Sequence, residues 1–239
     1  MTIGAVITAR STSSRYPRKH LGILGGLPMI SQIIKKLQYL ENLDRIILST
    51  TTNTSDNELC NVAWQAGADV TRGPEHDLLE RDFQAIDEYN LDAVLTISGD
   101  CPFLSNEYMQ ILIDGLRAEP HPEDYDSING FGNLAPMSGV VTAIKMKSGY
   151  EKDRMLMRKY SGKYSYEQYW IVETEEPELF KPLVLDTSYI NPPTITPMKM
   201  SIDWNLERLF WNKVIKWLGY YPQTIEDFNK AFGGMTSLD

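Results

Sequence analysis

Short apolar runs alternate with amphipathic stretches along the first half of the 239-residue chain. The runs that predict strands lie at 3–7, 45–51, 69–71 and 93–98. Hydrophobic residues at helical spacing predict the intervening helices at 28–42, 56–66 and 77–89. The centre of the second strand, Ile46 to Leu48, is apolar throughout, as a sheet covered on both faces requires. This alternation favours right-handed parallel crossovers, and it predicts a three-layer α/β sandwich with a mostly parallel, Rossmann-like sheet.

The pattern changes after Pro120, where the polar stretch 121–130 leads into a strand and residues 139–146 predict another strand. Residues 149–170 are rich in Lys, Arg and Tyr, and an ordinary amphipathic helix and hairpin would explain them. The chain returns through a short strand at 199–202 into a helix at 205–218. The apolar stripe predicted to pack that helix onto the core consists of Leu206, Leu209, Phe210, Val214 and Trp217. A chain of this length fits one large α/β domain, so we assign residues 1–239 to a single domain.

The composition narrows the classes of partner. A net charge of -9 argues against nonspecific nucleic-acid binding, which draws most of its affinity from Lys and Arg contacts to phosphates. No stretch reads as a signal peptide or a membrane span, so we expect a soluble, cytoplasmic protein with no membrane partner. The two cysteines, Cys60 and Cys101, lack metal-type spacing, and we expect neither a disulfide framework nor a zinc site. We interpret Cys101 as a small buried thiol.

A basic loop follows the first strand and stands against the acidic balance of the chain. Residues 9–19, ARSTSSRYPRK, carry four cations in a hydroxyl-rich stretch: Arg10, Arg15, Arg18 and Lys19. Backbone amides, hydroxyls and cations at a strand end can converge on one anion, which favours a polyphosphate ligand. The alternative is a solvated basic loop. Neither a Walker loop nor a G-x-G-x-x-G motif occurs, so a phosphate site here must be of another kind.

Two aspartates are candidate metal ligands. Asp100 follows the strand at 93–98 through one glycine, and Asp203 follows the return strand and precedes the last helix. Because the carboxyl ends of parallel strands meet at one edge, we expect Asp100 to lie beside the basic loop. A carboxylate near phosphate-binding cations suits Mg²⁺, the cofactor we expect. The alternatives are a helix cap near Ser105 or a pair with Arg10 for Asp100, and a helix N-cap for Asp203.

A two-part opening signature and four later pieces occur in the order and spacing of a known family. The first strand is followed by A-R-x-x-S-x-R-x-P-x-K and then by G-x-P-M-I. The later pieces are STTTN at 49–53, RGPEHDLLERDFQA at 72–85, ISGDCPFL at 97–104 and IDW at 202–204. Together they resemble the sugar cytidylyltransferases, in the acylneuraminate and 3-deoxy-manno-octulosonate cytidylyltransferase group and particularly its spore-coat polysaccharide biosynthesis branch. The resemblance is strong in the first half of the chain and looser beyond it.

The resemblance implies a nucleotide-diphospho-sugar transferase type of fold and a nucleotidyltransferase reaction. CMP would pass from CTP to an acidic or amino keto-sugar for surface polysaccharide biosynthesis, with release of pyrophosphate. The catalytic residues implied are Arg10, Arg15, Lys19 and Asp100, and the Mg²⁺ ligands implied are Asp100 and Asp203. The nucleotide-binding residues implied are Thr8, Ala9, Arg10, Ser11, Thr50, Thr51, Thr52, Arg72, Arg81, Ser98 and Gly99. Residues 135–175 would form an insertion for acceptor binding and for a homodimer contact.

Other interpretations stay open on the residues. A nucleotidyltransferase of different base or acceptor specificity, for example one making a CDP-linked phosphonate or alcohol, is the nearest alternative. A non-catalytic nucleotide-binding paralogue would keep the fold and the basic loop but lose the metal carboxylates. Arg81 has an alternative as an ion-pair member on its helix, with Asp77 four residues earlier. A single Asp stands in IDW where some relatives have I-D-x-D, which leaves the number of bound metals open.

Overall fold

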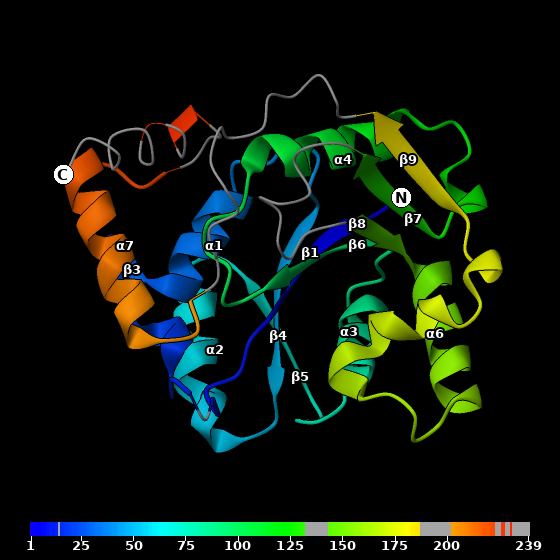
Figure 1. The fold of residues 1–239 in the computed structure, drawn as a ribbon, viewed down its shortest axis with the longest axis horizontal. Helices are drawn as coiled ribbons and strands as arrows, with labels where there is room; N and C mark the ends of the chain where they lie inside the picture. Colours follow the sequence, from blue (N-terminus) through cyan, green and yellow to red (C-terminus); the bar gives the residue numbers. More distant parts are fainter. Residues whose placement is uncertain (14, 132–142, 187–201, 223–225, 228–229, 231–239) are drawn as a thin grey trace.

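The computed structural model describes residues 1–13, 15–131, 143–186, 202–222, 226–227 and 230. In this part of the chain a seven-stranded sheet has the order β5-β4-β1-β6-β8-β7-β9 (Figure 1). Its strands are β1 (Ile3–Thr8), β4 (Arg45–Thr51), β5 (Asp69–Gly73), β6 (Ala93–Ser98), β7 (Ser127–Phe131), β8 (Ala143–Met146) and β9 (Pro182–Asp186). The pairs among β5, β4, β1 and β6 are parallel, β8 is antiparallel to both of its neighbours, and β7 pairs with β9 in parallel. The prediction of a mostly parallel sheet is confirmed.

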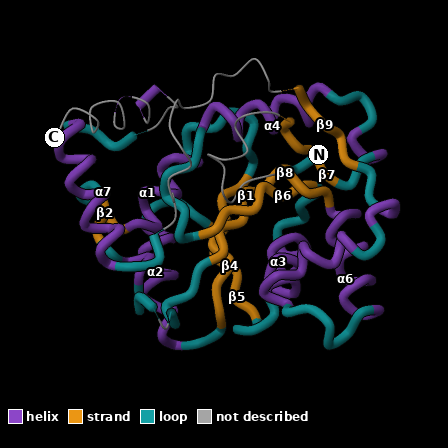
Figure 2. The backbone as a smooth tube through the Cα atoms, viewed as in Figure 1, coloured by secondary structure: helices purple, strands orange, loops and turns teal. Residues whose placement is uncertain are grey.

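Helices cover both faces of the sheet (Figure 2). One face packs against α1 (Met29–Leu37), α2 (Asn57–Gln65) and α4 (Asn106–Ala118), and α7 (Asn205–Leu218) joins the same hydrophobic cluster. The other packs against α3 (Leu78–Glu88), α6 (Lys147–Lys159) and the 3-10 segment η4 (Tyr166–Thr174). Along β1, Ile3, Ala5 and Ile7 face the first group and Val6 faces the second, as the period of a strand requires. The three-layer α/β sandwich is therefore confirmed. Among the described residues, no helix has both the length and the apolarity to cross a bilayer.

The predicted elements of the first half are present with small shifts at their ends. The helix predicted at 28–42 ends earlier, at Leu37, and a left-handed residue, Asn42 with φ 60°, follows it before β4. The start of α3 is fixed by Asp77, whose side chain accepts a hydrogen bond from the backbone N–H of Glu80 at 2.9 Å. Positions 139–142 and 199–201 of the two later predicted strands lie outside the described residues.

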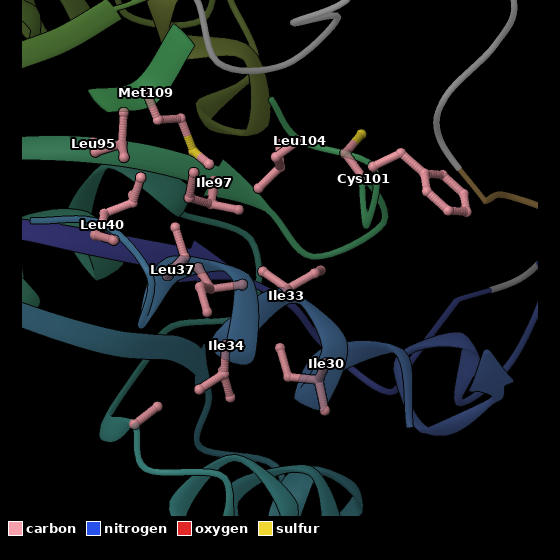
Figure 3. Close-up of a cluster of buried hydrophobic side chains, with 14 of the residues drawn as sticks. Ile30, Ile33, Ile34, Leu37, Leu40, Leu95, Ile97, Cys101, Leu104 and Met109 are labelled. Atoms are coloured by element: carbon pink, nitrogen blue, oxygen red, sulfur yellow. The ribbon is translucent and has the colours of Figure 1, made fainter. Parts of the chain in front are cut away.

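The larger core forms where α1 packs across the sheet (Figure 3). Ile30, Ile33, Ile34 and Leu37 recur at helical spacing along α1, and all four are fully buried. Burying such a side chain stabilises the fold by about 1.5–3 kcal/mol each. Cys101 lies in the same cluster and is buried, so the prediction of a small buried thiol is confirmed. Burial raises the pKa of this thiol, which keeps it in the neutral form.

The stripe predicted to bury α7 is wrong for three of its five residues. Leu206, Leu209 and Trp217 are 77%, 45% and 51% exposed. The helix instead buries Trp211 and its neighbours on the same side, Val214 and Ile215. Apolar residues occur on two sides of this helix, so hydrophobic spacing alone does not decide which side meets the core. Contact between the rings of Trp211 and Phe103, with centroids 4.1 Å apart, shows which one does.

Candidate active site

The loops that follow β1, β4, β5 and β6 meet at one edge of the sheet, as predicted. Thr8 at the end of β1 lies in register with Ser49 of β4 and with Ser98 of β6. One strand further along, Thr51 of β4 lies opposite Gly73 of β5. The basic loop after β1 therefore has the ends of both neighbouring strands beside it.

Hydrogen bonds to Glu75, which follows β5, join three of these loops. Arg10 donates to the backbone carbonyl of Glu75 at 3.1 Å, and the hydroxyl of Thr12 donates to its carboxylate at 2.7 Å. From the loop after β4, the side-chain amide of Asn53 donates to the other carboxylate oxygen at 2.8 Å. Bonds from Thr12 and Asn53 hold the pKa of Glu75 below its usual value. Arg10 thus reaches across the edge of the sheet rather than into solvent.

The buried carboxylate of Asp56 fixes the start of the basic loop through hydrogen bonds. It accepts hydrogen bonds from the backbone N–H of Ser11 at 2.7 Å, from the hydroxyl of Thr50 at 3.0 Å, and from the backbone N–H of Thr51 at 3.2 Å and the hydroxyl of Thr51. Burial raises the pKa of Asp56, but the hydrogen bonds from Thr51 and Ser11 outweigh it and hold that pKa below its usual value. Sequence reasoning missed this residue, although a carboxylate in the hydroxyl-rich run after β4 was a usable signal.

The residues expected to bind nucleotide at the end of β4 divide into two groups. Thr50 and Thr51 are fully buried with their hydroxyls on Asp56, whereas Thr52 is exposed. Arg72 clamps this loop, because it donates to the carbonyl of Thr51 at 2.8 Å and also bonds the loop at residues 53 and 57. Arg81 is buried on α3, where its side chain packs close to Gly73. Thr52 therefore lies at the surface, whereas the side chain of Arg72 is held by hydrogen bonds within the protein.

The Ser98–Gly99–Asp100 step brings the first candidate metal ligand to the edge of the sheet. A Cβ at Gly99 would lie 2.7 Å from the Cβ of Ala9 and 2.9 Å from the carbonyl oxygen of Thr8, so the close approach of the two strand ends requires glycine. Asp100 accepts a hydrogen bond from the hydroxyl of Ser98. Behind this step, the Nδ1 of His20 donates to the carbonyl of Gly99 at 2.8 Å. Burial, aided by the charge of Lys19, lowers the pKa of His20 to about 4, so the imidazole is neutral at pH 7.

Lys19 joins the two candidate metal ligands. Its Nζ lies 2.7 Å from a carboxylate oxygen of Asp100 and 3.3 Å from one of Asp203, and Arg15 approaches the same oxygen of Asp203 at 3.1 Å. The Lys19 ammonium is buried in the fold. Burial raises the pKa of Asp100, but the charge of Lys19 outweighs it and keeps that pKa below its usual value. The predicted meeting of Asp100, Asp203, Arg15 and Lys19 is present in the structure.

Backbone contacts place Asp203 beside Asp100. The backbone N–H of Ile202 donates to the carbonyl of Asp100 at 2.7 Å. The start of α7 is capped by Glu207, which accepts from the backbone N–H groups of Asp203 at 2.6 Å and of Trp204 at 3.0 Å. The helix begins at Asn205 with Trp204 at its N-cap position, and the side chain of Asp203 pairs with Lys19 and Arg15, so the alternative of Asp203 as the N-cap is wrong.

These residues suit a hard divalent cation. No group of three or more His, Cys, Asp or Glu side chains in the described part of the chain has the arrangement of a metal site. Mg²⁺, however, is usually held by one or two carboxylates together with phosphate oxygens and water. Asp100 and Asp203 supply that pair, because oxygens of both reach one ammonium group. The pair could hold Mg²⁺ when phosphate oxygens complete its shell.

Comparison with known proteins agrees with this geometry. A sequence profile described as Cytidylyltransferase matches residues 5–193. The chain belongs to the cytidylyltransferase family. This cytidylyltransferase-family chain is 29% identical over 194 residues to the uncharacterized protein MJ1063 of Methanocaldococcus jannaschii, covering 81% of the chain and 73% of that protein.

Two examples illustrate the relatives that have functional names. One is the 3-deoxy-manno-octulosonate cytidylyltransferase of Maricaulis maris, 29% identical over 124 residues, which cover 50% of the chain and 46% of that protein. The other is the spore coat polysaccharide biosynthesis protein SpsF of Bacillus subtilis, 26% identical over 112 residues, covering 45% and 47%. The chain thus spans under half the length of each of these two relatives.

A solved structure confirms the fold over nearly the whole chain. A cytidylyltransferase from Leptospira borgpetersenii superposes with a TM-score of 0.79 at 22% identity, covering 99% of this chain and 96% of that one. A CMP:2-keto-3-deoxy-manno-octonic acid synthetase complexed with CTP superposes with a TM-score of 0.64 at 11% identity, covering 91% and 99%. At these identities the similarity establishes the three-dimensional fold.

Proposed function

We propose that this chain transfers CMP from CTP to the hydroxyl of a sugar-like acceptor, with Mg²⁺ as its cofactor. The observation that carries the proposal is the meeting of Asp100 and Asp203 around Lys19, beside a basic loop at the carboxyl edge of the sheet. Membership of the cytidylyltransferase family and the CTP complex of a similarly folded synthetase support cytidine as the base.

Each group at this edge has a role in the reaction. Arg10, Arg15 and Lys19 bind and neutralise the triphosphate, and the loop they lie on is held by Asp56. When bound to Asp100 and Asp203, Mg²⁺ would stabilise negative charge at the α-phosphate and at the attacking oxygen. The attacking hydroxyl oxygen forms a bond to the α-phosphorus and gives up its proton to solvent, while the bond from the α-phosphorus to the oxygen that bridges the α- and β-phosphates breaks, and pyrophosphate leaves with that oxygen. Catalysis is mainly positioning and electrostatic stabilisation by groups already fixed in the fold.

An acidic or amino keto-sugar, used for a surface polysaccharide, is the acceptor class we propose, and the names of the relatives support it. The lysines in and around α6 add no support for an acidic acceptor, because carboxylates of the chain already pair with them. The pairs are Lys145 with Asp153 and Glu173, Lys152 with Asp126, Lys159 with Glu176 and Lys163 with Glu175.

The assembly and location of the protein are also proposals. We propose a homodimer formed through residues 135–175, which the resemblance implies, and a cytoplasmic location. Positions 135–142 of that segment lie outside the described residues. Sedimentation of the purified chain at two concentrations would measure its oligomeric state, and a monomer at both would contradict the homodimer.

A pyrophosphate-release assay tests the activity. Each of the four common nucleoside triphosphates is combined with a panel of acidic, amino and neutral sugars, with and without Mg²⁺. Release with CTP, dependent on Mg²⁺ and on one acceptor class, is the expected result. Preference for another triphosphate would favour a nucleotidyltransferase of different specificity, and no release with any combination would favour a non-catalytic nucleotide-binding protein.

A further inference from the structure

The cations of the basic loop already have partners within the chain. Arg10 bonds to the backbone of Glu75, Arg18 forms an ion pair with Glu58, and Arg15 and Lys19 pair with the two candidate metal ligands. A triphosphate that binds to this loop must therefore compete with groups of the chain. The competition matters most at Lys19, because its partners are the carboxylates that a metal would also need.

The charges around Lys19 balance without any ligand. Asp100 and Asp203 contribute two negative charges, and Lys19 and Arg15 contribute two positive charges. A divalent cation that entered alone would leave an excess of positive charge beside a buried ammonium. A triphosphate that entered alone would meet the two carboxylates. Either ligand by itself is thus opposed by like charges.

Neither ligand meets this electrostatic repulsion when the metal and the triphosphate bind together. The carboxylates of Asp100 and Asp203 can then turn to the metal, while Lys19 and Arg15 turn to the phosphates. Lys19 is well placed for such an exchange, because its Nζ contacts both carboxylates at 2.7 and 3.3 Å and its backbone starts the short helix η1 (Lys19–Leu21). That backbone is fixed by the neighbouring His20, so the exchange needs motion of the side chain only.

We propose that Lys19 acts as the internal counter-ion of the metal ligands and makes metal binding depend on bound nucleotide. The proposal rests on the proposed function for its ligands, a nucleoside triphosphate and a divalent cation. It assigns Lys19 a role in the free protein, in addition to its role toward phosphate. In that role Lys19 suppresses metal binding until its ammonium group pairs with a bound triphosphate instead of with the carboxylates.

Binding of Mn²⁺, measured by the electron paramagnetic resonance signal of free Mn²⁺, tests this without any turnover. The wild-type chain is titrated with and without CTP, in the absence of acceptor, and a titration of CTP without protein gives the Mn²⁺ that the nucleotide binds by itself, which is subtracted. Replacing Lys19 by methionine (Lys19→Met) removes the ammonium and keeps a side chain of similar length. Arg18→Met is the matched control, since Arg18 lies in the same loop but pairs with Glu58. Circular dichroism melting checks that each variant is folded.

Lys19→Met is expected to bind Mn²⁺ at least tenfold more tightly than the wild type when CTP is absent, and Arg18→Met is expected to match the wild type. In the wild type, CTP is expected to raise the affinity for Mn²⁺ at least tenfold. Lys19→Met with no gain in affinity, or Arg18→Met with an equal gain, would overturn the proposal. If Lys19→Met does not fold, the titration of the wild type still tests the proposal, because equal Mn²⁺ affinity with and without CTP would overturn it as well.

Pyrophosphate release by the wild type separates this inference from the proposed function. A chain that releases pyrophosphate but shows no effect of Lys19→Met on Mn²⁺ affinity would contradict the inference alone. A chain that gains Mn²⁺ affinity in Lys19→Met but never releases pyrophosphate would contradict the proposed function and leave the counter-ion role in place.

Discussion

Replacing Asp56 by alanine should destabilise the protein and weaken nucleotide binding together. The substitution removes the acceptor of four hydrogen bonds, from the backbone N–H groups of Ser11 and Thr51 and from the hydroxyls of Thr50 and Thr51. Hydroxyls can rotate to other acceptors, but the two buried amides cannot. Each buried donor left without an acceptor costs about 1–3 kcal/mol, so the two amides set the loss at about 2–6 kcal/mol. For a chain of this size, that lowers Tm by about 4–24 °C.

Urea unfolding and CTP binding by calorimetry measure the two effects. Asp69→Ala is the control, because Asp69 is an exposed carboxylate in a surface ion pair with Arg45 at 3.4 Å, and such pairs contribute at most about 1 kcal/mol. The contribution of Asp56 should be complete above its unfolded-chain pKa of 3.8 and should be lost as the pH falls through its lower folded-state pKa. A loss of stability in Asp56→Ala no greater than in Asp69→Ala would refute this reasoning.

Three further outcomes follow from the site. Asp203→Asn should lower the rate of pyrophosphate release by about a hundredfold and raise the Mg²⁺ concentration needed for half-maximal rate, while an unchanged rate would remove Asp203 from the site. Gly99→Ala places a Cβ 2.9 Å from the carbonyl oxygen of Thr8, and should cost about 1–3 kcal/mol in urea unfolding together with a lower kcat/KM. The free energy of unfolding of the wild type should fall as the pH drops from 6.5 towards 4, because the unfolded chain protonates His20 at a pH where the folded chain does not. In urea unfolding at several pH values, His20→Asn should show a weaker dependence of this free energy on pH.

Local pattern predicted much of the fold, because each strand and helix of the first half carries its own periodicity. It failed on α7, where Trp211 and Trp217 lie on different sides of the helix and only contact with the core shows which is buried. Asp56 was missed for a related reason. Its place in a hydroxyl-rich run marked it as a candidate, but its role depends on the hydrogen bond that the backbone N–H of Ser11 donates to it from 45 residues earlier, and no local pattern reports that contact. Arg72 shows the converse, since a residue of β5 that was expected to bind nucleotide forms three side-chain hydrogen bonds to the end of β4 and the segment that follows it.

The two halves of the site differ in what supports them. The family profile ends at residue 193, so it covers the basic loop and Asp100 but stops short of Asp203. The case for Asp203 therefore comes from its contacts: the bond from Ile202 to the carbonyl of Asp100, and the packing of Trp211 on Phe103, three residues beyond Asp100. Both contacts bring the C-terminal helix onto the segment that carries the first carboxylate. It follows that the N-terminal part of the sheet carries the basic loop and Asp100, and that Asp203, the second carboxylate of the proposed site, joins them through the contacts of Ile202 and Trp211.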